Sequence, residues 1–258
     1  MAFDLSSITT GVCRRAPRII LLGVEKIGKS SFAAQSNSPV FLPIKGEEGI
    51  DALNVAKTPT CNAFAEAASW LQALMSGEHE YQTSVIDSVS TMEPLIWQYV
   101  CEKHKVESIE KVGGGYGKGY TESLAVWRQL TEMLDALRSE RNMASILIGH
   151  VKVKRFDDPA GPSYDQYQFD INDRAANLLF RWADCILFCN TKVVVQSEDT
   201  GFDTKNRGID ITGGQRFLFT QKRPAHPGGG RGAYGHIPYE LPLSWEAFQS
   251  AVAAAMSQ

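Results

Sequence analysis

The octapeptide Gly23-Val-Glu-Lys-Ile-Gly-Lys-Ser30 constrains the fold more than any other feature of this chain. It follows an apolar run that predicts a buried strand at residues 18–23, and it precedes a short helical pattern at residues 30–35. A glycine-rich turn in this position directs backbone N–H groups and the positive end of a helix toward one point. The order of strand, glycine-rich turn, lysine and serine predicts a phosphate-binding loop.

The predicted loop assigns a role to each of its polar residues. Lys29 is expected to reach the β- and γ-phosphates of ATP, and the Ser30 hydroxyl is expected to hold Mg²⁺. Lys26 is interpreted as a solvated charge within the loop. The full set of predicted nucleotide contacts is Gly23, Val24, Glu25, Lys26, Ile27, Gly28, Lys29, Ser30 and Ser31.

Strand-like and helical patterns alternate along the rest of the chain, which predicts an α/β fold with a mostly parallel sheet flanked by helices. Further strands are expected at residues 40–44, 83–87, 144–149, 183–190, 192–196 and 216–221. Helices are expected at residues 61–75, 92–105, 121–141, 173–182 and 244–256. With 258 residues, the chain is expected to form one domain at residues 18–258 after a short segment at residues 1–17.

Composition narrows the functional classes. The net charge of −3 excludes a globally basic nucleic-acid binder, although a local basic patch stays open. The chain has no apolar run long enough for a transmembrane helix and no visible secretory signal. Its five cysteines form no CxxC pair, which favours reduced thiols. We therefore expect a cytoplasmic protein with no membrane partner.

Acidic residues and a histidine follow three of the expected strands. Asp87 ends one strand and suits a water-mediated contact to Mg²⁺, although it could instead cap the following turn. The next residue is Ser88, so a water-activating carboxylate must come from elsewhere. Glu47 and Glu48 follow another strand and are candidates for that base, or else ordinary surface acids. His150 can contact the γ-phosphate or its water, or else a loop carbonyl.

This set of residues, in this order, resembles the RecA-like recombinase core. The resemblance implies that the catalytic glutamate follows the second strand, which makes Glu47 the first choice and Glu48 the alternate. It also implies that Asp51 lies near the nucleotide base. His150 stands where that family carries a glutamine that couples the nucleotide state to a DNA-binding loop.

A closer similarity is to short, phage-encoded RecA-like nucleotide-binding proteins linked to single-strand annealing and recombination. It covers residues 18–248 and is carried by the segments 115–120, 150–156, 182–184 and 221–224. The resemblance implies two DNA-facing loops, at residues 111–120 and 151–168. Lysine and arginine can neutralise phosphates there, and tyrosine can stack on unpaired bases. The predicted DNA contacts are Lys111, Tyr116, Lys118, Tyr120, Lys152, Lys154 and Arg155.

A plain flexible linker and a solvated strand edge remain alternatives for these two loops, with Val151 and Val153 expected to be buried. Lys222, Arg223 and Arg231 lie where RecA-like subunits offer a cation to the neighbour's nucleotide, or else form a flexible basic surface loop.

The favoured function is an ATP-hydrolysing, single-stranded-DNA-binding protein that assembles into a homo-oligomeric ring or filament and promotes annealing. A single-strand binding protein or an annealase is a further expected partner. The alternatives are a helicase-loader or partition-type ATPase, a non-catalytic nucleotide-sensing module, and a small-molecule kinase. The serine after Asp87 argues against the loader, and the sparse arginines argue against a kinase lid.

Overall fold

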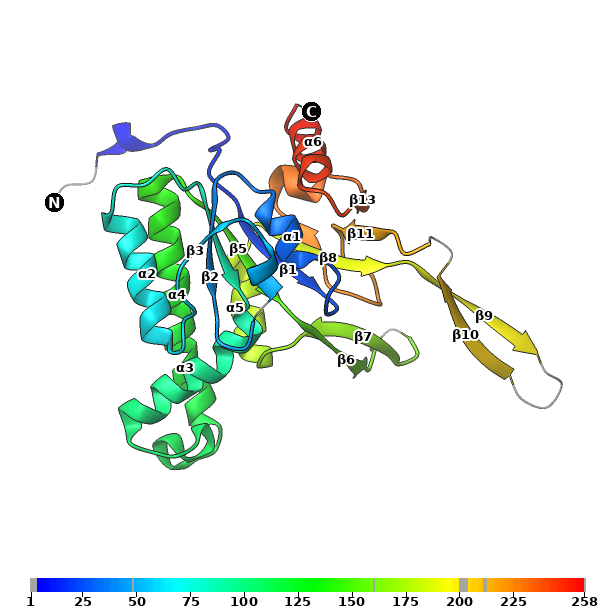
Figure 1. The fold of residues 1–258 in the computed structure, drawn as a ribbon, viewed down its shortest axis with the longest axis horizontal. Helices are drawn as coiled ribbons and strands as arrows, with labels where there is room; N and C mark the ends of the chain where they lie inside the picture. Colours follow the sequence, from blue (N-terminus) through cyan, green and yellow to red (C-terminus); the bar gives the residue numbers. More distant parts are fainter. Residues whose placement is uncertain (1–3, 48, 160, 200–203, 211–212, 258) are drawn as a thin grey trace.

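The computed structural model describes residues 4–47, 49–159, 161–199, 204–210 and 213–257 (Figure 1). In these residues one nine-stranded sheet forms the centre of the molecule, in the order β13–β11–β8–β1–β5–β4–β2–β3, with β12 also paired to β8. Its strands are β1 (Arg18–Gly23), β2 (Pro39–Pro43), β3 (Ala56–Lys57), β4 (Thr83–Asp87), β5 (Ala144–Gly149), β8 (Cys185–Thr191), β11 (Arg216–Phe219), β12 (Gly229–Gly230) and β13 (Glu240–Pro242).

All pairings from β3 through β8 are parallel, and β11, β12 and β13 add antiparallel pairings at the other side. The predicted α/β class with a mostly parallel sheet is confirmed. In the parts of the chain that are described, no helix is long and apolar enough to cross a bilayer.

Helices cover both faces of the sheet (Figure 1). They are α1 (Lys29–Ala34), α2 (Phe64–Ser76), α3 (Val89–His104), α4 (Lys118–Arg141), α5 (Asp173–Trp182) and α6 (Trp245–Met256), with 3₁₀ turns at Leu5–Ser7, Gly49–Ala52, Ile109–Gly114 and Gly232–Gly235. Ile20 and Leu22 of β1 join the core formed with α2 to α5, whereas Ile19 and Leu21 join the core formed with α1 and α6. Because both faces are buried, β1 is apolar from Ile19 to Leu22 rather than alternating.

The register of the parallel strands gathers the expected site residues at one edge. Leu22 of β1 pairs with Gly149 of β5, and Asp87 of β4 pairs with Ile148 of the same strand. Pro43 at the end of β2 pairs in turn with Asp87. The segments that follow β1, β2, β4 and β5 therefore leave the sheet side by side, at the carboxyl edge where α/β folds bind ligands.

The segment expected as a mobile loop at residues 151–168 is instead an antiparallel hairpin of β6 (Val151–Phe156) and β7 (Tyr164–Phe169). The expectation that Val153 is buried is wrong, because its side chain is 61% exposed. The hairpin leaves the main sheet and forms a separate two-stranded sheet (Figure 1). The strand expected at residues 192–196 is longer, and it pairs as β9 (Val193–Asp199) with β10 (Thr204–Asp210) in a projecting hairpin.

The glycine-rich segment at residues 111–120 is also more ordered than expected. Helix α4 begins at Lys118 with Gly117 as its N-cap, rather than at Thr121. A side chain at Gly119 would collide with the carbonyl of Ile109, so glycine allows α4 to pack directly on the preceding 3₁₀ turn. At Gly119, glycine therefore serves close packing rather than flexibility.

Candidate nucleotide-binding site

The glycine-rich loop joins β1 to α1 and needs glycine at two positions for different reasons. Gly28 caps α1 with a φ of 106°, in the left-handed region that favours glycine. A Cβ at Gly23 would lie 2.5 Å from the carbonyl oxygen of Cys189 on β8, so Gly23 allows the neighbouring strand to approach. Ile27 is 6% exposed and anchors the loop in the core, so its side chain is turned away from the ligand side.

Lys29 is folded back over the loop that it follows. Its Nζ donates to the carbonyl oxygens of Gly23 and Val24, each at 2.9 Å. Burial lowers the pKa of this lysine, and the nearby carboxylates of Asp87 and Glu47 act in the opposite direction. The ammonium group is therefore positioned at the loop, with hydrogen bonds that phosphate oxygens can replace.

Ser30 and Asp87 form the second pair of the site. The Ser30 hydroxyl donates to Oδ2 of Asp87 at 2.6 Å. Asp87 is 4% exposed, and this burial raises its pKa although the Ser30 hydrogen bond acts against the change. A hydroxyl beside a buried carboxylate fits Mg²⁺, which prefers oxygen ligands and keeps several waters. The residues present are thus suited to hold the ion that accompanies ATP.

Glu47 is held in place by two donors. Its Oε1 accepts hydrogen bonds from the Ser88 hydroxyl and from Nε2 of His150, both at 2.7 Å. Burial disfavours the charged carboxylate, but these hydrogen bonds outweigh it and lower the pKa of Glu47. With Glu47 ionised, His150 must carry its proton on Nε2, and Nδ1 is then a buried atom with no partner in the described part of the chain.

These groups surround one cleft of about 710 Å³. The residues lining it include Glu25, Lys26, Gly28, Lys29, Ser30, Ser31, Glu47, Asp87, Ser90, Thr91, His150 and Arg216. The structure does not bring Asp51 into this cleft, because its carboxylate is 75% exposed and pairs with Lys57 at 2.9 Å in a neighbouring pocket. Glu48, the alternate base, lies outside the described residues.

The AAA domain family matches residues 15–232. The chain belongs to this family. A solved structure titled "Crystal structure of the RadB recombinase" is similar over 83% of this chain and 92% of that one, with 14% identity and a TM-score of 0.41. No curated protein matches. The predicted P-loop core is borne out by the match to the AAA domain and by the mostly parallel sheet, in which the loop joins β1 to α1.

Arg216 is a residue of the AAA domain that the sequence analysis missed. It begins β11, whose antiparallel pairing to β8 brings Arg216 opposite Thr191 at the carboxyl edge. A Cβ built at Gly28 would lie 3.0 Å from its guanidinium, so Arg216 stands directly over the phosphate-binding loop. The only signal for it would have been the antiparallel turn of the chain after β8, which the sequence pattern does not show.

The three cations proposed to act on a neighbouring subunit lie away from their own chain's cleft. Arg223 stacks over the ring of Tyr239 at 4.3 Å, and Arg231 is 3.9 Å from Asp184. Lys222 is exposed at a separate pocket between β7 and α5. None of the three lines the nucleotide cleft of this chain.

The predicted DNA contacts of the first loop have different surroundings. Lys111 pairs with Glu107 at 2.8 Å, and Lys118 donates to the carbonyl of Gly113 at 2.9 Å. Tyr120 packs edge-to-face on Trp97 with 5.4 Å between ring centroids. Tyr116 is fully exposed, so it is the aromatic ring of this loop that is most open to an unpaired base.

The cations of the β6–β7 hairpin are paired with acids of the same chain. Lys152 lies 3.2 Å from Asp170, Lys154 lies 3.2 Å from Asp173, and Arg155 lies 3.8 Å from Asp157. Such exposed pairs contribute little to stability. They do reduce the charge that the hairpin presents to a phosphate chain.

Proposed function

We propose that this AAA-domain protein is an ATPase that couples hydrolysis of ATP to binding of single-stranded DNA. The observation that carries the proposal is the Glu47 carboxylate, which is held by Ser88 and His150 at the same edge as Lys29, Ser30 and Asp87. A partly buried, ionised acceptor beside a phosphate-binding loop is the arrangement that hydrolysis requires.

Each group has a defined task in this proposal. The loop N–H groups and Lys29 bind the phosphates, and Ser30 with Asp87 holds Mg²⁺, which neutralises charge on the phosphate oxygens when it is bound. Glu47 orients a water through its carboxylate and accepts the proton that the water loses. His150 and Ser88 fix the carboxylate, so they are positioning residues.

The proposal includes DNA because the hairpin begins directly after His150. The N–H of Asp170 at the other end of the hairpin donates to the His150 carbonyl at 3.0 Å, so both ends of the hairpin meet at this residue. A change at the γ-phosphate that moves His150 would be passed to Lys152, Lys154 and Arg155. Annealing in phage DNA metabolism, with a single-strand binding protein or annealase as partner, is the biological setting that we propose.

Assembly into a homo-oligomer is part of the same proposal. Lys222, Arg223 and Arg231 lie outside their own cleft, as a cation delivered to a neighbouring subunit must. Such a cation stabilises charge on the transferring phosphoryl group and makes turnover depend on assembly.

Nucleotide-dependent DNA binding tests the proposal. Fluorescence anisotropy of a labelled single-stranded oligonucleotide is measured with Glu47→Gln, which is expected to bind ATP but not turn it over. Tighter binding with ATP and Mg²⁺ than with ADP, and no ATP effect in Lys29→Ala, would support the proposal. Binding that ignores the nucleotide would contradict the coupling, and absence of binding in every state would favour a nucleotide-sensing module.

A further inference from the structure

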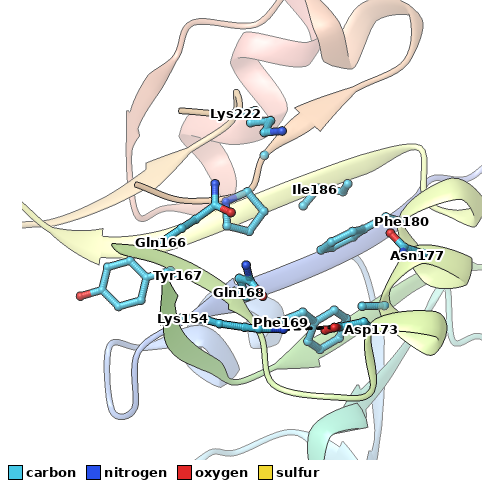
Figure 2. Close-up of a pocket in the computed structure, with 13 residues that line it drawn as sticks. Lys154, Gln166, Tyr167, Gln168, Phe169, Asp173, Asn177, Phe180, Ile186 and Lys222 are labelled. Carbon is cyan, nitrogen blue, oxygen red and sulfur yellow. Dashed lines mark hydrogen bonds and ion pairs between the residues drawn. The ribbon is translucent and has the colours of Figure 1, made fainter. Parts of the chain in front are cut away.

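A second pocket, of about 500 Å³, lies between β7, α5 and the segment at residues 222–228 (Figure 2). The nucleotide cleft is lined by Val151 and Asp170 at the base of the hairpin, whereas this pocket is lined by Lys154, Gln166 and Gln168 farther along it. The two sites therefore share the hairpin but none of their lining residues.

One wall of the pocket is formed by α5 and carries an aromatic ring. Asp173, Ala176, Asn177 and Phe180 have the i, i+3, i+4, i+7 spacing that places them on one face of α5. Phe180 is partly buried, and its ring is tilted by 35° against Phe169 with 5.8 Å between centroids. Figure 2 shows Phe180, Ile186 and Gln168 around a common space.

Two side-chain amides at this space are available to a ligand. Gln166 is already engaged, since its Nε2 donates to the carbonyl of Pro224 at 2.8 Å. The amides of Gln168 and Asn177 have no such bond to any other described side chain or carbonyl. Each amide offers both a donor and an acceptor, which is what the edge of a nucleobase requires.

Two lysines lie at the pocket. Lys222 is exposed and has no ion pair among the described residues. Lys154 reaches across to Asp173 at 3.2 Å, so its charge is partly compensated. Cations beside an aromatic wall are the arrangement that holds a nucleic-acid backbone while a base stacks.

The pocket is held open by contacts around it. The N–H of Tyr167 donates to the carbonyl of Ala225 at 2.8 Å, which fastens β7 to the segment that carries Lys222. His226 stacks on Phe188 at 4.6 Å with only 9° between the rings, and Tyr167 packs on the same Phe188 at 5.3 Å. A site fixed in this way is formed before its ligand arrives, which favours binding.

We propose that this pocket takes one unpaired base of the single strand. In this proposal the base stacks on the ring of Phe180. The side-chain amides of Gln168 and Asn177 form hydrogen bonds with the edge of the base, and Lys222 and Lys154 contact the adjoining phosphates. The inference rests on the proposed binding of single-stranded DNA and adds the place where the base contact is made.

A comparison of two oligonucleotides of equal length, one of thymidines and one fully abasic, tests the pocket. Phe180→Ala is expected to weaken binding of the thymidine strand about tenfold and to leave the abasic strand unchanged, because only the former has a ring to stack. Asn177→Ala, at an exposed position, should give a smaller loss with the same selectivity. Tyr116→Ala is the matched control for base stacking outside the pocket, and its loss should add to that of Phe180→Ala.

The outcomes separate this inference from the proposed function. Strong binding of the thymidine strand by the native chain, with equal effects of Phe180→Ala and Asn177→Ala on both strands, would overturn the base pocket alone. A change in oligomeric state in place of base-selective loss would assign the pocket to a neighbouring subunit and also overturn it. No binding of either strand by the native chain would overturn the proposed function and the pocket together.

Discussion

At the residue scale, three carboxyl groups that are buried or partly buried have different environments. Hydrogen bonds keep the pKa of Glu47 low, whereas burial raises the pKa of Asp87. Burial also raises the pKa of Glu93 on α3 to about 7, although both of its oxygens accept from the N–H of Asn172 at 2.9 Å. The nucleotide cleft thus holds Glu47 as a ready base and Asp87 beside Ser30, whereas Glu93 lies outside the residues that line it and titrates near neutrality.

Removal of His150 is expected to shift the acid limb of the rate–pH profile. A base works only when deprotonated, so activity falls as the pH drops through its pKa. His150→Ala removes a hydrogen bond that lowers the pKa of Glu47, and the fall should therefore begin at a higher pH. The profile of kcat against pH measures this, and Ser88→Ala should move it in the same direction. An unchanged acid limb in both variants would remove Glu47 from the role of base.

Glu93 should leave a signature in the pH dependence of stability. Its pKa is about 7 in the folded chain and near its ordinary 4.5 when unfolded, so between these values only the folded state holds the proton. The free energy of unfolding should therefore fall as the pH rises from about 4.5 to about 7, by about 2–3 kcal/mol from this group.

Glu93→Gln should remove that fall, as measured by urea unfolding at several pH values. Glu132→Gln, at an exposed position on α4, is the control. A slope that stays the same in Glu93→Gln would contradict the assignment.

Individual site residues were predictable where chemistry alone required them. The loop motif identified Lys29 and Ser30, and the serine after Asp87 led to Glu47 and Glu48 after another strand, of which the resemblance favoured Glu47. Arg216 could not be found in the same way, because its approach to the loop depends on how β11 pairs with β8. Asp51 was expected near the nucleotide base through a resemblance, and here its carboxylate pairs with Lys57 instead.

At the scale of elements, the β6–β7 hairpin connects the two candidate sites. It begins directly after His150, which contacts Glu47, and residues of both its strands line the pocket beside α5. The alternation of valine and lysine at residues 151–154 was consistent with a strand. It did not show whether other elements would cover the valine side of that strand. That depends on the hairpin leaving the sheet, which no local pattern encodes.

The internal ion pairs of the hairpin should restrain DNA binding. Asp173→Asn frees Lys154 from its partner while Asn172 still caps α5, so the hairpin gains about one effective positive charge. We expect tighter binding of a single-stranded oligonucleotide and a steeper dependence of log K on log salt, by up to about 0.7.

Titrations at several salt concentrations measure both quantities. Asp157→Asn is the control, because Asp157 lies 3.8 Å from Arg155 and so forms the looser ion pair. It should change the affinity and its salt dependence less. Weaker binding in Asp173→Asn would contradict a DNA-facing hairpin.

At the scale of the whole molecule, the sheet separates two charged ends. The carboxyl edge of the sheet holds the nucleotide cleft. The opposite edge, where the parallel strands begin, holds Asp184, which forms salt bridges with Arg18 at 2.8 Å and with Arg138 at 3.0 Å. Arg231 approaches the same carboxylate from a loop and is more than half exposed. Arg231 therefore lies away from the nucleotide cleft of its own chain, as the proposed role in a neighbouring subunit requires.

Mixed subunits test the trans cation. A chain with Lys29→Ala lacks the phosphate contact but keeps its cations, whereas the triple variant Lys222→Ala/Arg223→Ala/Arg231→Ala keeps its cleft. We expect each to hydrolyse ATP slowly alone and the mixture to recover turnover, because one chain supplies the cation and the other the cleft. Single reversions in the triple variant would then identify the cation. No recovery at any mixing ratio would show that these residues do not act between subunits.

The most direct test of the central claim is ATP hydrolysis with Mg²⁺, measured with and without a single-stranded oligonucleotide. We predict that the strand raises turnover in the native chain, and that Lys29→Ala and Glu47→Gln each lose activity by a factor on the order of 10²–10⁴. Turnover that is independent of the strand, or that survives in Glu47→Gln, would contradict a DNA-coupled ATPase with Glu47 as its base.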